Sequence, residues 1–170
     1  MIIWITGISG AGKTTIGQKL FSNLNKDGRK IIFLDGDGLR QIFASTKDKT
    51  YQRENRIKLA LQYSKLCQFL SNSGLDVVIA TISMYSEVYE WNSNNLNNYH
   101  EVYLKVPNEV VIDRDPKGLY SDFKDGKISN LAGFDLKIDQ PQTPTLTIEN
   151  YGEVTPDYAV SQIMSTLKLI

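Results

Sequence analysis

The glycine-rich motif near the N-terminus is the feature that most constrains what this chain can fold into. The pattern G-x-x-x-x-G-K-[ST] is met at every fixed position by Gly7-Ile8-Ser9-Gly10-Ala11-Gly12-Lys13-Thr14. The apolar run Ile2 to Thr6 precedes this motif, and an amphipathic helical pattern follows it. In that setting, successive backbone N–H groups form an anion nest, and the helix N-terminus adds the positive end of its dipole. The motif therefore predicts a phosphate-binding loop between a strand and a helix.

Residue types within the motif indicate a nucleoside triphosphate as the ligand. Lys13 is expected to reach the β- and γ-phosphates of ATP, and the hydroxyl of Thr14 is expected to ligate Mg²⁺. Cofactor contacts are predicted for Gly7, Ser9, Gly10, Ala11, Gly12, Lys13, Thr14 and Thr15. The alternative is a glycine turn that binds nothing, and the flanking strand and helix patterns argue against it.

Strand-like and helix-like patterns alternate along the chain. A first helix is expected from the glycine loop to about Asn25, a second from Ile57 through Leu70, and a last one after Thr155 as N-cap and Pro156. Alternating strands and helices predict an α/β fold with a mainly parallel sheet and one domain over residues 1–170. Five apolar, β-rich runs are expected to form the sheet: Ile2 to Thr6, Lys30 to Leu34, Asp76 to Ser83, Glu101 to Val106 and Thr145 to Glu149.

Two stretches between these patterns carry less apolar character. Pro116 to Pro144 mixes Gly, Asp, Lys and Pro, and a segment of this length inside a compact domain is usually a functional loop. The asparagine-rich stretch 92–98 is interpreted as a solvated helix end or loop without chemistry. No role is assigned to His100, the one histidine.

Charge and composition limit the partners of the chain. Nineteen basic and nineteen acidic residues cancel, so no overall field draws the protein to nucleic acid or to an anionic membrane. No apolar stretch approaches the roughly 20 residues that span a bilayer. The single Cys67 excludes an intramolecular disulfide, and Met1 to Ile5 has the character of a strand rather than of a signal peptide. We therefore expect a cytoplasmic protein with a small-molecule partner.

Two carboxylates follow the second predicted strand. The segment Leu34-Asp35-Gly36-Asp37-Gly38-Leu39-Arg40 places them at the carboxyl edge of a parallel sheet, where ligands bind. One carboxylate near Mg²⁺ can organise metal-bound water, and another near the acceptor can take a hydroxyl proton. A glycine-rich turn with solvated aspartates is the alternative, and the phosphate-binding loop beside it favours the functional interpretation.

Two further segments contribute candidate site residues. Thr81-Ile82-Ser83-Met84-Tyr85 follows the third strand and turns polar where that strand must stop. Arg114-Asp115-Pro116-Lys117-Gly118-Leu119-Tyr120 offers two cations and an aromatic ring on a segment that can fold over bound nucleotide and exclude water. We interpret the latter and the loop that follows it as a lid, and a surface excursion is the alternative.

These segments, in this order, resemble the adenylylsulfate kinases, which phosphorylate the ribose 3′-hydroxyl of adenylylsulfate. The resemblance runs from Ile2 to about Pro144, and the segment Arg114 to Tyr120 is close to a family signature. It implies a three-layer P-loop kinase fold with a lid over about 116–144, commonly dimeric. It also implies ATP and Mg²⁺ as cofactors and an acceptor nucleotide held between the Asp-Gly-Asp turn and the lid.

The resemblance also implies roles for individual residues. Asp37 matches the candidate general base, so that Lys13, Asp35 and Asp37 form the expected catalytic set, and Asp35 with Thr14 would place the metal. Arg114 is expected to contact ATP. Acceptor contacts are implied for Asp37, Arg40, Arg53, Arg56, Ile82, Ser83, Lys117, Leu119 and Leu131, with Arg40 and Arg53 at the anionic phosphoryl end.

Departures from the family pattern fall on the acceptor side. The family clamps the acceptor's adenine between two phenylalanines, whereas this chain has Ser45-Thr46-Lys47-Asp48-Lys49-Thr50 at the first place and Leu131-Ala132-Gly133 at the second. Where the family has an asparagine this chain has Arg56, and where it has an arginine this chain has Ser86. A proline and a tyrosine of the family's lid are replaced by Lys137 and Ile138. Stacking on an aromatic face contributes on the order of 1–3 kcal/mol per base, so losing both faces should weaken purine binding.

These departures favour an acceptor with another base, such as a smaller pyrimidine. The chain resembles the divergent family members of capsule phosphoramidate synthesis, which phosphorylate cytidine diphosphoramidate at the ribose 3′-hydroxyl. Adenylylsulfate itself stays open as the acceptor, as does a nucleotide-binding protein without turnover. A GTPase-type switch is disfavoured, because Asn25-Lys26-Asp27-Gly28 differs from the guanine-reading Asn-Lys-x-Asp in spelling and in place.

Overall fold

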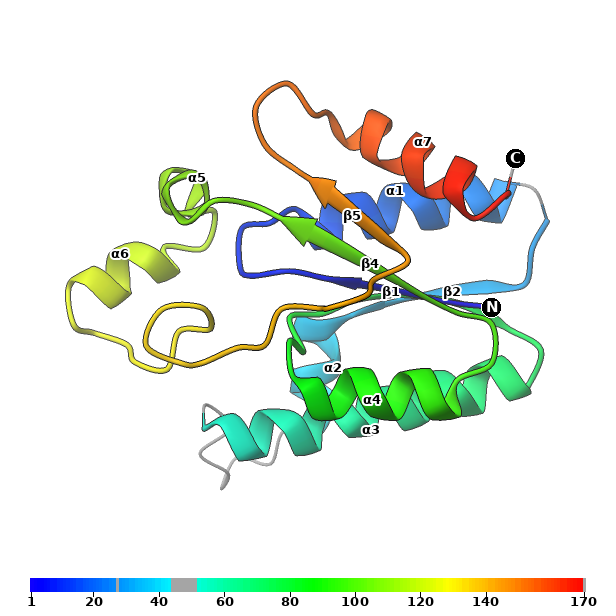
Figure 1. Cartoon of the computed structure of the whole chain (residues 1–170), viewed down its shortest axis with the longest axis horizontal. Helices are drawn as coiled ribbons and strands as arrows, with labels where there is room; N and C mark the ends of the chain where they lie inside the picture. The colour runs from blue at the N-terminus through cyan, green and yellow to red at the C-terminus, as the bar shows by residue number, and fades with distance from the viewer. Residues whose placement is uncertain (27, 44–51, 170) are drawn as a thin grey trace.

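The carboxyl ends of five parallel strands meet along one edge of a single sheet (Figure 1). The computed structural model describes residues 1–26, 28–43 and 52–169. Within them the strand order is β2-β3-β1-β4-β5, and every neighbouring pair is parallel. The strands are β1 (Ile2–Thr6), β2 (Ile31–Asp35), β3 (Asp76–Ala80), β4 (Tyr99–Lys105) and β5 (Leu146–Glu149).

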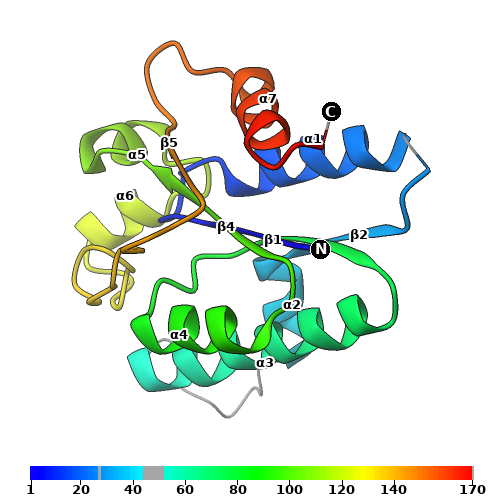
Figure 2. The same ribbon diagram turned by 45° about the vertical axis from the view of Figure 1, so that its right-hand side comes forward.

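Helices cover both faces of the sheet and give the molecule three layers. Helices α1 (Lys13–Lys26) and α7 (Pro156–Thr166) lie on one face, and α3 (Arg53–Asn72) and α4 (Ser86–Asn95) on the other (Figures 1 and 2). Short helices α2 (Gly36–Phe43), α5 (Asn108–Arg114) and α6 (Leu119–Lys124) follow the carboxyl ends of strands or lie in the lid segment. The predicted three-layer α/β fold is confirmed.

Strand β1 forms the centre of the core because both of its faces are buried. Ile3 and Ile5 pack with the residues under α1 and α7, whereas Ile2 and Trp4 pack with those under α3 and α4. All four side chains are fully shielded from solvent. A continuous apolar run is what a strand buried on both faces requires.

The sequence predicted the regular elements unevenly. The five strands and helices α1, α3 and α7 are confirmed, and the Thr155 side chain accepts the cap bond from the backbone N–H of Tyr158 at 3.2 Å. The third strand ends at Ala80 rather than at Ser83. The expected turn after Asp35 is instead helix α2, and helices α5 and α6 were not predicted, because glycines and short length hide their helical pattern. The asparagine-rich stretch is a helix end, as predicted, since α4 stops at Asn95. Its expected solvation is wrong for Asn92, which faces the core and is fully buried.

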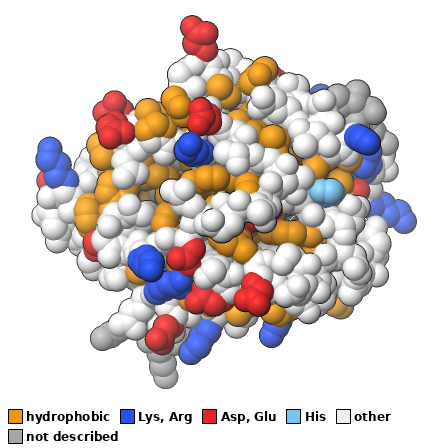
Figure 3. Space-filling model, in the orientation of Figure 1, with side chains coloured by type: hydrophobic (Ala, Val, Ile, Leu, Met, Phe, Trp, Pro, Cys, Tyr) orange, Lys and Arg blue, Asp and Glu red, His pale blue; other side chains and the backbone are white. Residues whose placement is uncertain are grey.

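The distribution of charged side chains on the surface is consistent with the zero net charge of the chain. Acidic and basic side chains are intermingled on the face that Figure 3 displays. Among the residues that the structure describes, no helix combines the length and apolar character that a bilayer span requires.

One carboxylate is buried under α4. The Glu101 side chain in β4 is only 7% exposed, and its Oε1 atom has no hydrogen-bond partner among the described residues. Burial raises the pKa of Glu101 to about 7, although the hydroxyl of Tyr99 acts in the opposite direction. Because the folded-state pKa exceeds the ordinary value, the folded protein binds the extra proton, and its stability should fall as pH rises from about 4.5 to 7.

We predict that Glu101→Gln stabilises the protein at pH 8 and flattens the pH dependence of its stability between pH 5 and 8. The neutral amide avoids the cost of a buried charge, which is on the order of 3 kcal/mol from the size of such a shift. Thermal unfolding at several pH values measures both effects. The exposed Glu153→Gln is the matched control, and equal slopes for the wild type and Glu101→Gln would contradict the assignment.

Candidate functional site

The glycine loop joins the end of β1 to the start of α1, at the edge where the carboxyl ends of the strands meet (Figure 1). Gly10 and Gly12 have φ angles of +74° and +90°, in the left-handed region that side chains disfavour. A Cβ atom on Gly12 would also lie 2.7 Å from Nδ2 of Asn150. Glycine is therefore required at position 12 by conformation and by space.

Lys13 closes over the loop that precedes it. Its Nζ atom donates a hydrogen bond to the carbonyl of Ile8 at 2.8 Å. Burial and, after it, the nearby Lys117 ammonium lower the pKa of Lys13 to about 8, against the opposing charges of Asp37 and Asp35. The ammonium is thus positioned beside the loop and is poised to lose its proton in mildly alkaline solution.

Thr14 at the start of α1 and Asp35 at the end of β2 bring two side-chain oxygen groups together. The Thr14 hydroxyl donates to Oδ1 of Asp35 at 3.0 Å. Hydroxyl and carboxylate oxygens suit Mg²⁺, which binds proteins through one or two carboxylates together with phosphate and water oxygens. The two residues therefore fit the metal role predicted for them.

Asp37 forms an ion pair with Lys117 of the lid segment, and both side chains are about half exposed. Burial would raise the pKa of Asp37, but its hydrogen bond to Lys117 and the charges of Lys117, Arg40 and Lys13 outweigh burial and place this pKa below its ordinary value. Asp37 is therefore ionised at neutral pH and can accept a proton or a hydrogen bond.

A cavity of about 680 Å³ lies over the glycine loop. Asp35 and Arg114 line it, as predicted for the cofactor side, and the Arg114 guanidinium donates to the carbonyls of Gly10 at 3.3 Å and Asn150 at 2.9 Å. Sequence reasoning assigned no site role to Ile16 or Pro116. It also missed Asn150, Val154 and Pro156, because they follow β5 and belong to no recognised motif. The lining consists of Ser9, Gly10, Gly12, Lys13, Thr14, Thr15, Ile16, Asp35, Asp37, Arg114, Pro116, Lys117, Asn150, Val154 and Pro156.

A second cavity, of about 490 Å³, lies between α2, α3 and the lid segment. Its lining combines four cations with an apolar wall. Ser9, Asp37 and Lys117 also line the first cavity, so the two meet at the Asp37–Lys117 pair. The remaining lining residues are Arg40, Arg56, Ile82, Leu119, Lys127, Ile128, Ser129, Asn130, Leu131 and Ala132.

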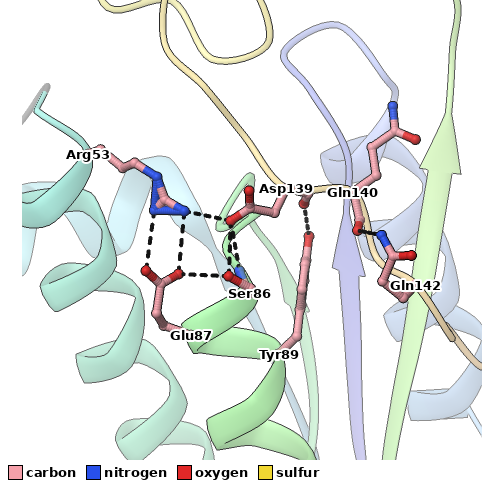
Figure 4. A network of polar contacts seen from close by, with 7 residues as sticks. All are labelled: Arg53, Ser86, Glu87, Tyr89, Asp139, Gln140 and Gln142. Carbon is pink, nitrogen blue, oxygen red and sulfur yellow. Dashed lines mark hydrogen bonds and ion pairs between the residues drawn. The ribbon is translucent and has the colours of Figure 1, made fainter.

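Arg53 lies outside the residues that line these two cavities, although it was predicted to hold the acceptor. Its guanidinium donates to Oδ2 of Asp139 at 2.5 Å and faces Glu87 at 3.5 Å (Figure 4). It also stands 5.1 Å from the centre of the Tyr85 ring. The backbone N–H of Ser86 also donates to Asp139, at 3.0 Å. The structure thus assigns Arg53 to a network that anchors the end of the lid segment, and its acceptor role remains a prediction.

The other predicted acceptor residues are distributed over two cavities. Ser83 is buried beside a small cavity of about 30 Å³, and its hydroxyl pairs with that of Thr81 at 2.8 Å. Arg40 and Arg56 line this small cavity as well as the second one. Where the family has its two phenylalanines, residues 45–50 lie outside the described part of the chain, whereas Leu131 lines the second cavity.

Comparison with known proteins connects this site to a family. The family model described as adenylylsulphate kinase matches residues 1–149. The cytidine diphosphoramidate kinase of Campylobacter jejuni is 39% identical over 168 residues, covering 99% of this chain and 96% of that protein. An adenylyl-sulfate kinase of Pseudomonas aeruginosa is 35% identical over 169 residues, covering 98% and 85%.

A solved structure supports the fold independently. The Mycobacterium tuberculosis APS kinase CysC in complex with AMPPNP and APS superposes with a TM-score of 0.88. It shares 24% sequence identity and covers 98% of this chain and 96% of its own. At 24% identity, this structural similarity is evidence for the fold alone.

We predict that the affinity for a triphosphate falls above pH 8 because Lys13 loses its charge. With a pKa of about 8, the charged form of Lys13 is nearly complete at pH 7 and scarce at pH 9, so binding of AMPPNP with Mg²⁺ should weaken about tenfold over this range. Titration calorimetry at the two pH values measures the change. Lys13→Arg, which keeps its charge, should show a flatter profile, and equal profiles for the two proteins would refute the assignment.

Proposed function

Because the chain belongs to the adenylylsulphate kinase family of phosphotransferases, we propose that it transfers the γ-phosphate of ATP to the ribose 3′-hydroxyl of cytidine diphosphoramidate. The observation that carries this proposal is the pair of cavities joined at Asp37 and Lys117. One cavity has the glycine loop as its wall, and the other is cationic and closed by the lid segment. Donor and acceptor entering from the two sides would meet at this pair.

The glycine loop supplies the donor side. Its backbone N–H groups and Lys13 would hold the phosphates of ATP, with Arg114 at the rim of the cavity. Thr14 and Asp35 would hold Mg²⁺, which neutralises charge on the β- and γ-phosphates when it is bound. Most of the rate enhancement then comes from alignment of the reactants and neutralisation of charge.

Asp37 and Lys117 act on the transfer itself. Asp37 is ionised at neutral pH and lies where both cavities end, so it can accept the proton of the acceptor hydroxyl as the phosphoryl group moves. Lys117 is its ion-pair partner and can turn its ammonium toward the transferring phosphoryl oxygens. The pair therefore provides a base and a cation at one point.

The acceptor side combines charge with a wall whose described lining residues include no aromatic ring. Arg53 pairs with Asp139 and Glu87 outside the second cavity, whereas Arg40 and Arg56 line it, so the latter two are assigned to the anionic 5′ group of the acceptor. Leu131 and Ala132 line the cavity at the place where the family has a phenylalanine of its adenine clamp. This wall supports a base smaller than adenine, which agrees with the identity to the cytidine diphosphoramidate kinase.

Adenylylsulfate is the second candidate acceptor. Relatives named adenylyl-sulfate kinases are 34–35% identical over nearly the whole chain, only slightly less than the cytidine diphosphoramidate kinase. A third possibility, nucleotide binding without turnover, is opposed by the full set Lys13, Thr14, Asp35 and Asp37 at the junction. The family resemblance also supports a cytoplasmic homodimer as part of this proposal.

The choice of acceptor is tested by ADP release from ATP and Mg²⁺ with a panel of acceptors. We predict strong stimulation by cytidine diphosphoramidate and weak stimulation by adenylylsulfate and by the uridine and guanosine analogues, because none of the described lining residues offers an aromatic ring that would clamp a purine. Preferential stimulation by adenylylsulfate would identify the second candidate. ADP release that no acceptor stimulates would support nucleotide binding without transfer.

The role of Asp37 is tested by Asp37→Asn. We predict a loss of roughly 100-fold in kcat, because a positioned general base contributes about 10²–10⁴-fold, while the affinity for AMPPNP changes little. Steady-state kinetics and calorimetry measure the two quantities separately. Asp113→Asn on the exposed side of α5 is the control, and undiminished turnover of Asp37→Asn would exclude the general base role.

A further inference from the structure

The outward-facing carbonyls of the glycine loop are held by side chains from several parts of the fold. Four consecutive carbonyls, those of residues 8–11, each accept a hydrogen bond from a different side chain. The donors come from α1, from the ends of α5 and β5, and from α6. The pairs are Lys13 with Ile8 at 2.8 Å, Tyr120 with Ser9 at 2.7 Å, Arg114 with Gly10 at 3.3 Å, and Asn150 with Ala11 at 2.8 Å.

These bonds fix the direction in which the loop presents its dipoles. An anion nest works when successive N–H groups point inward, which requires that the carbonyls of the same peptides point away. A carbonyl that is buried without a donor is costly, and one that turns inward would repel phosphate. The four donors therefore stabilise the orientation of the loop that binds an anion.

Tyr120 differs from the other donors because contacts within the lid segment hold it in place. Its side chain is 5% exposed, and its ring packs 5.1 Å, centre to centre, from that of Phe134 in the same lid segment. The carboxylate of Asp115 accepts hydrogen bonds from the backbone N–H groups of Tyr120, at 3.0 Å, and Ser121, at 2.9 Å. The phenol is thus held by a well-anchored segment of the lid and not by the loop that it contacts.

The same segment also lines the acceptor cavity. Lys117 and Leu119, just before Tyr120, belong to the lining of that cavity, and Lys117 pairs with Asp37. Tyr120 itself is not among the residues that line either large cavity. Its hydroxyl therefore contacts the glycine loop from outside the two large cavities.

We propose that Tyr120 is a positioning residue that holds the Ser9 carbonyl outward and so shapes the phosphate nest from the lid. The inference rests on the ATP binding that the proposed function requires, and it does not depend on which acceptor is used. Removing the hydroxyl leaves the Ser9 carbonyl without its side-chain donor while the aromatic ring stays in place. The nest then loses affinity for the phosphates, even in the absence of acceptor.

The test compares the affinity of Tyr120→Phe and wild type for AMPPNP with Mg²⁺, without acceptor, by calorimetry. We expect roughly fivefold to thirtyfold weaker binding, the range for losing a hydrogen bond to a partly buried carbonyl that orients the loop. In turnover assays, KM for ATP should rise by more than kcat falls. Tyr158→Phe is the matched control, because that phenol lies on the exposed face of α7 and accepts from Gln162 at 3.1 Å.

Thermal unfolding separates positioning from a general loss of structure. Weaker AMPPNP binding by a Tyr120→Phe protein that is folded at the assay temperature supports the proposal, and binding within twofold of wild type overturns it. If Tyr120→Phe does not fold, Phe134→Leu replaces it, since loss of the packed ring should also weaken AMPPNP binding, and unchanged affinity would overturn the proposal. If no acceptor stimulates ADP release by the wild type, the proposed function is refuted. The comparison of AMPPNP affinities between Tyr120→Phe and wild type still decides the role of Tyr120.

Discussion

The parallel register of β1 with its neighbours is the constraint on which the site depends. Ile5 pairs with Ala80 of β3 and with Val102 of β4, and Asp35 of β2 also pairs with Ala80. This register makes the strands end together, so that the glycine loop and Asp35 leave the sheet at one edge. A shift of one residue would turn the side chains of β1 to the opposite faces and separate Thr14 from Asp35. The buried packing of β1 on both sides opposes such a shift.

The site has a local excess of positive charge, although the chain as a whole has no net charge. Lys13, Lys117 and Arg40 gather around Asp35 and Asp37. Burial, helped by the Lys117 charge, lowers the pKa of Lys13, and the three cations lower the pKa of Asp37 against the effect of burial. A cluster of this kind is cationic toward a phosphate and still contains an ionised carboxylate that can act as a base. The arrangement explains how a chain with equal numbers of acidic and basic residues can bind two anionic nucleotides side by side.

The sequence predicted those parts of the fold and site that depend on local pattern. The glycine loop, the Thr14–Asp35 pair and the five strands follow from short motifs and from apolar periodicity. The contacts of Asn150 and Tyr120 with the loop join residues more than 100 positions apart, and no short motif encodes them. The ion pair of Arg53 with Asp139 was equally unpredictable from the sequence, because the course of the lid segment brings Asp139 to Arg53. Long-range polar contacts of this kind depend on the packed structure and not on the local sequence.

The contrast between the two cavities explains why the resemblance to the family is uneven. The donor loop binds phosphate through backbone N–H groups, so it tolerates few changes at its glycines, where a Cβ would meet Asn150 or strain the chain. The acceptor cavity binds through side chains, and a single replacement there changes charge or shape without disturbing the sheet. Under the proposed function, pairing of Arg53 with Asp139, together with Arg56 and Leu131 in the cavity, would alter recognition of the acceptor while the donor side keeps its geometry. Specificity can diverge in such a fold more readily than the type of reaction.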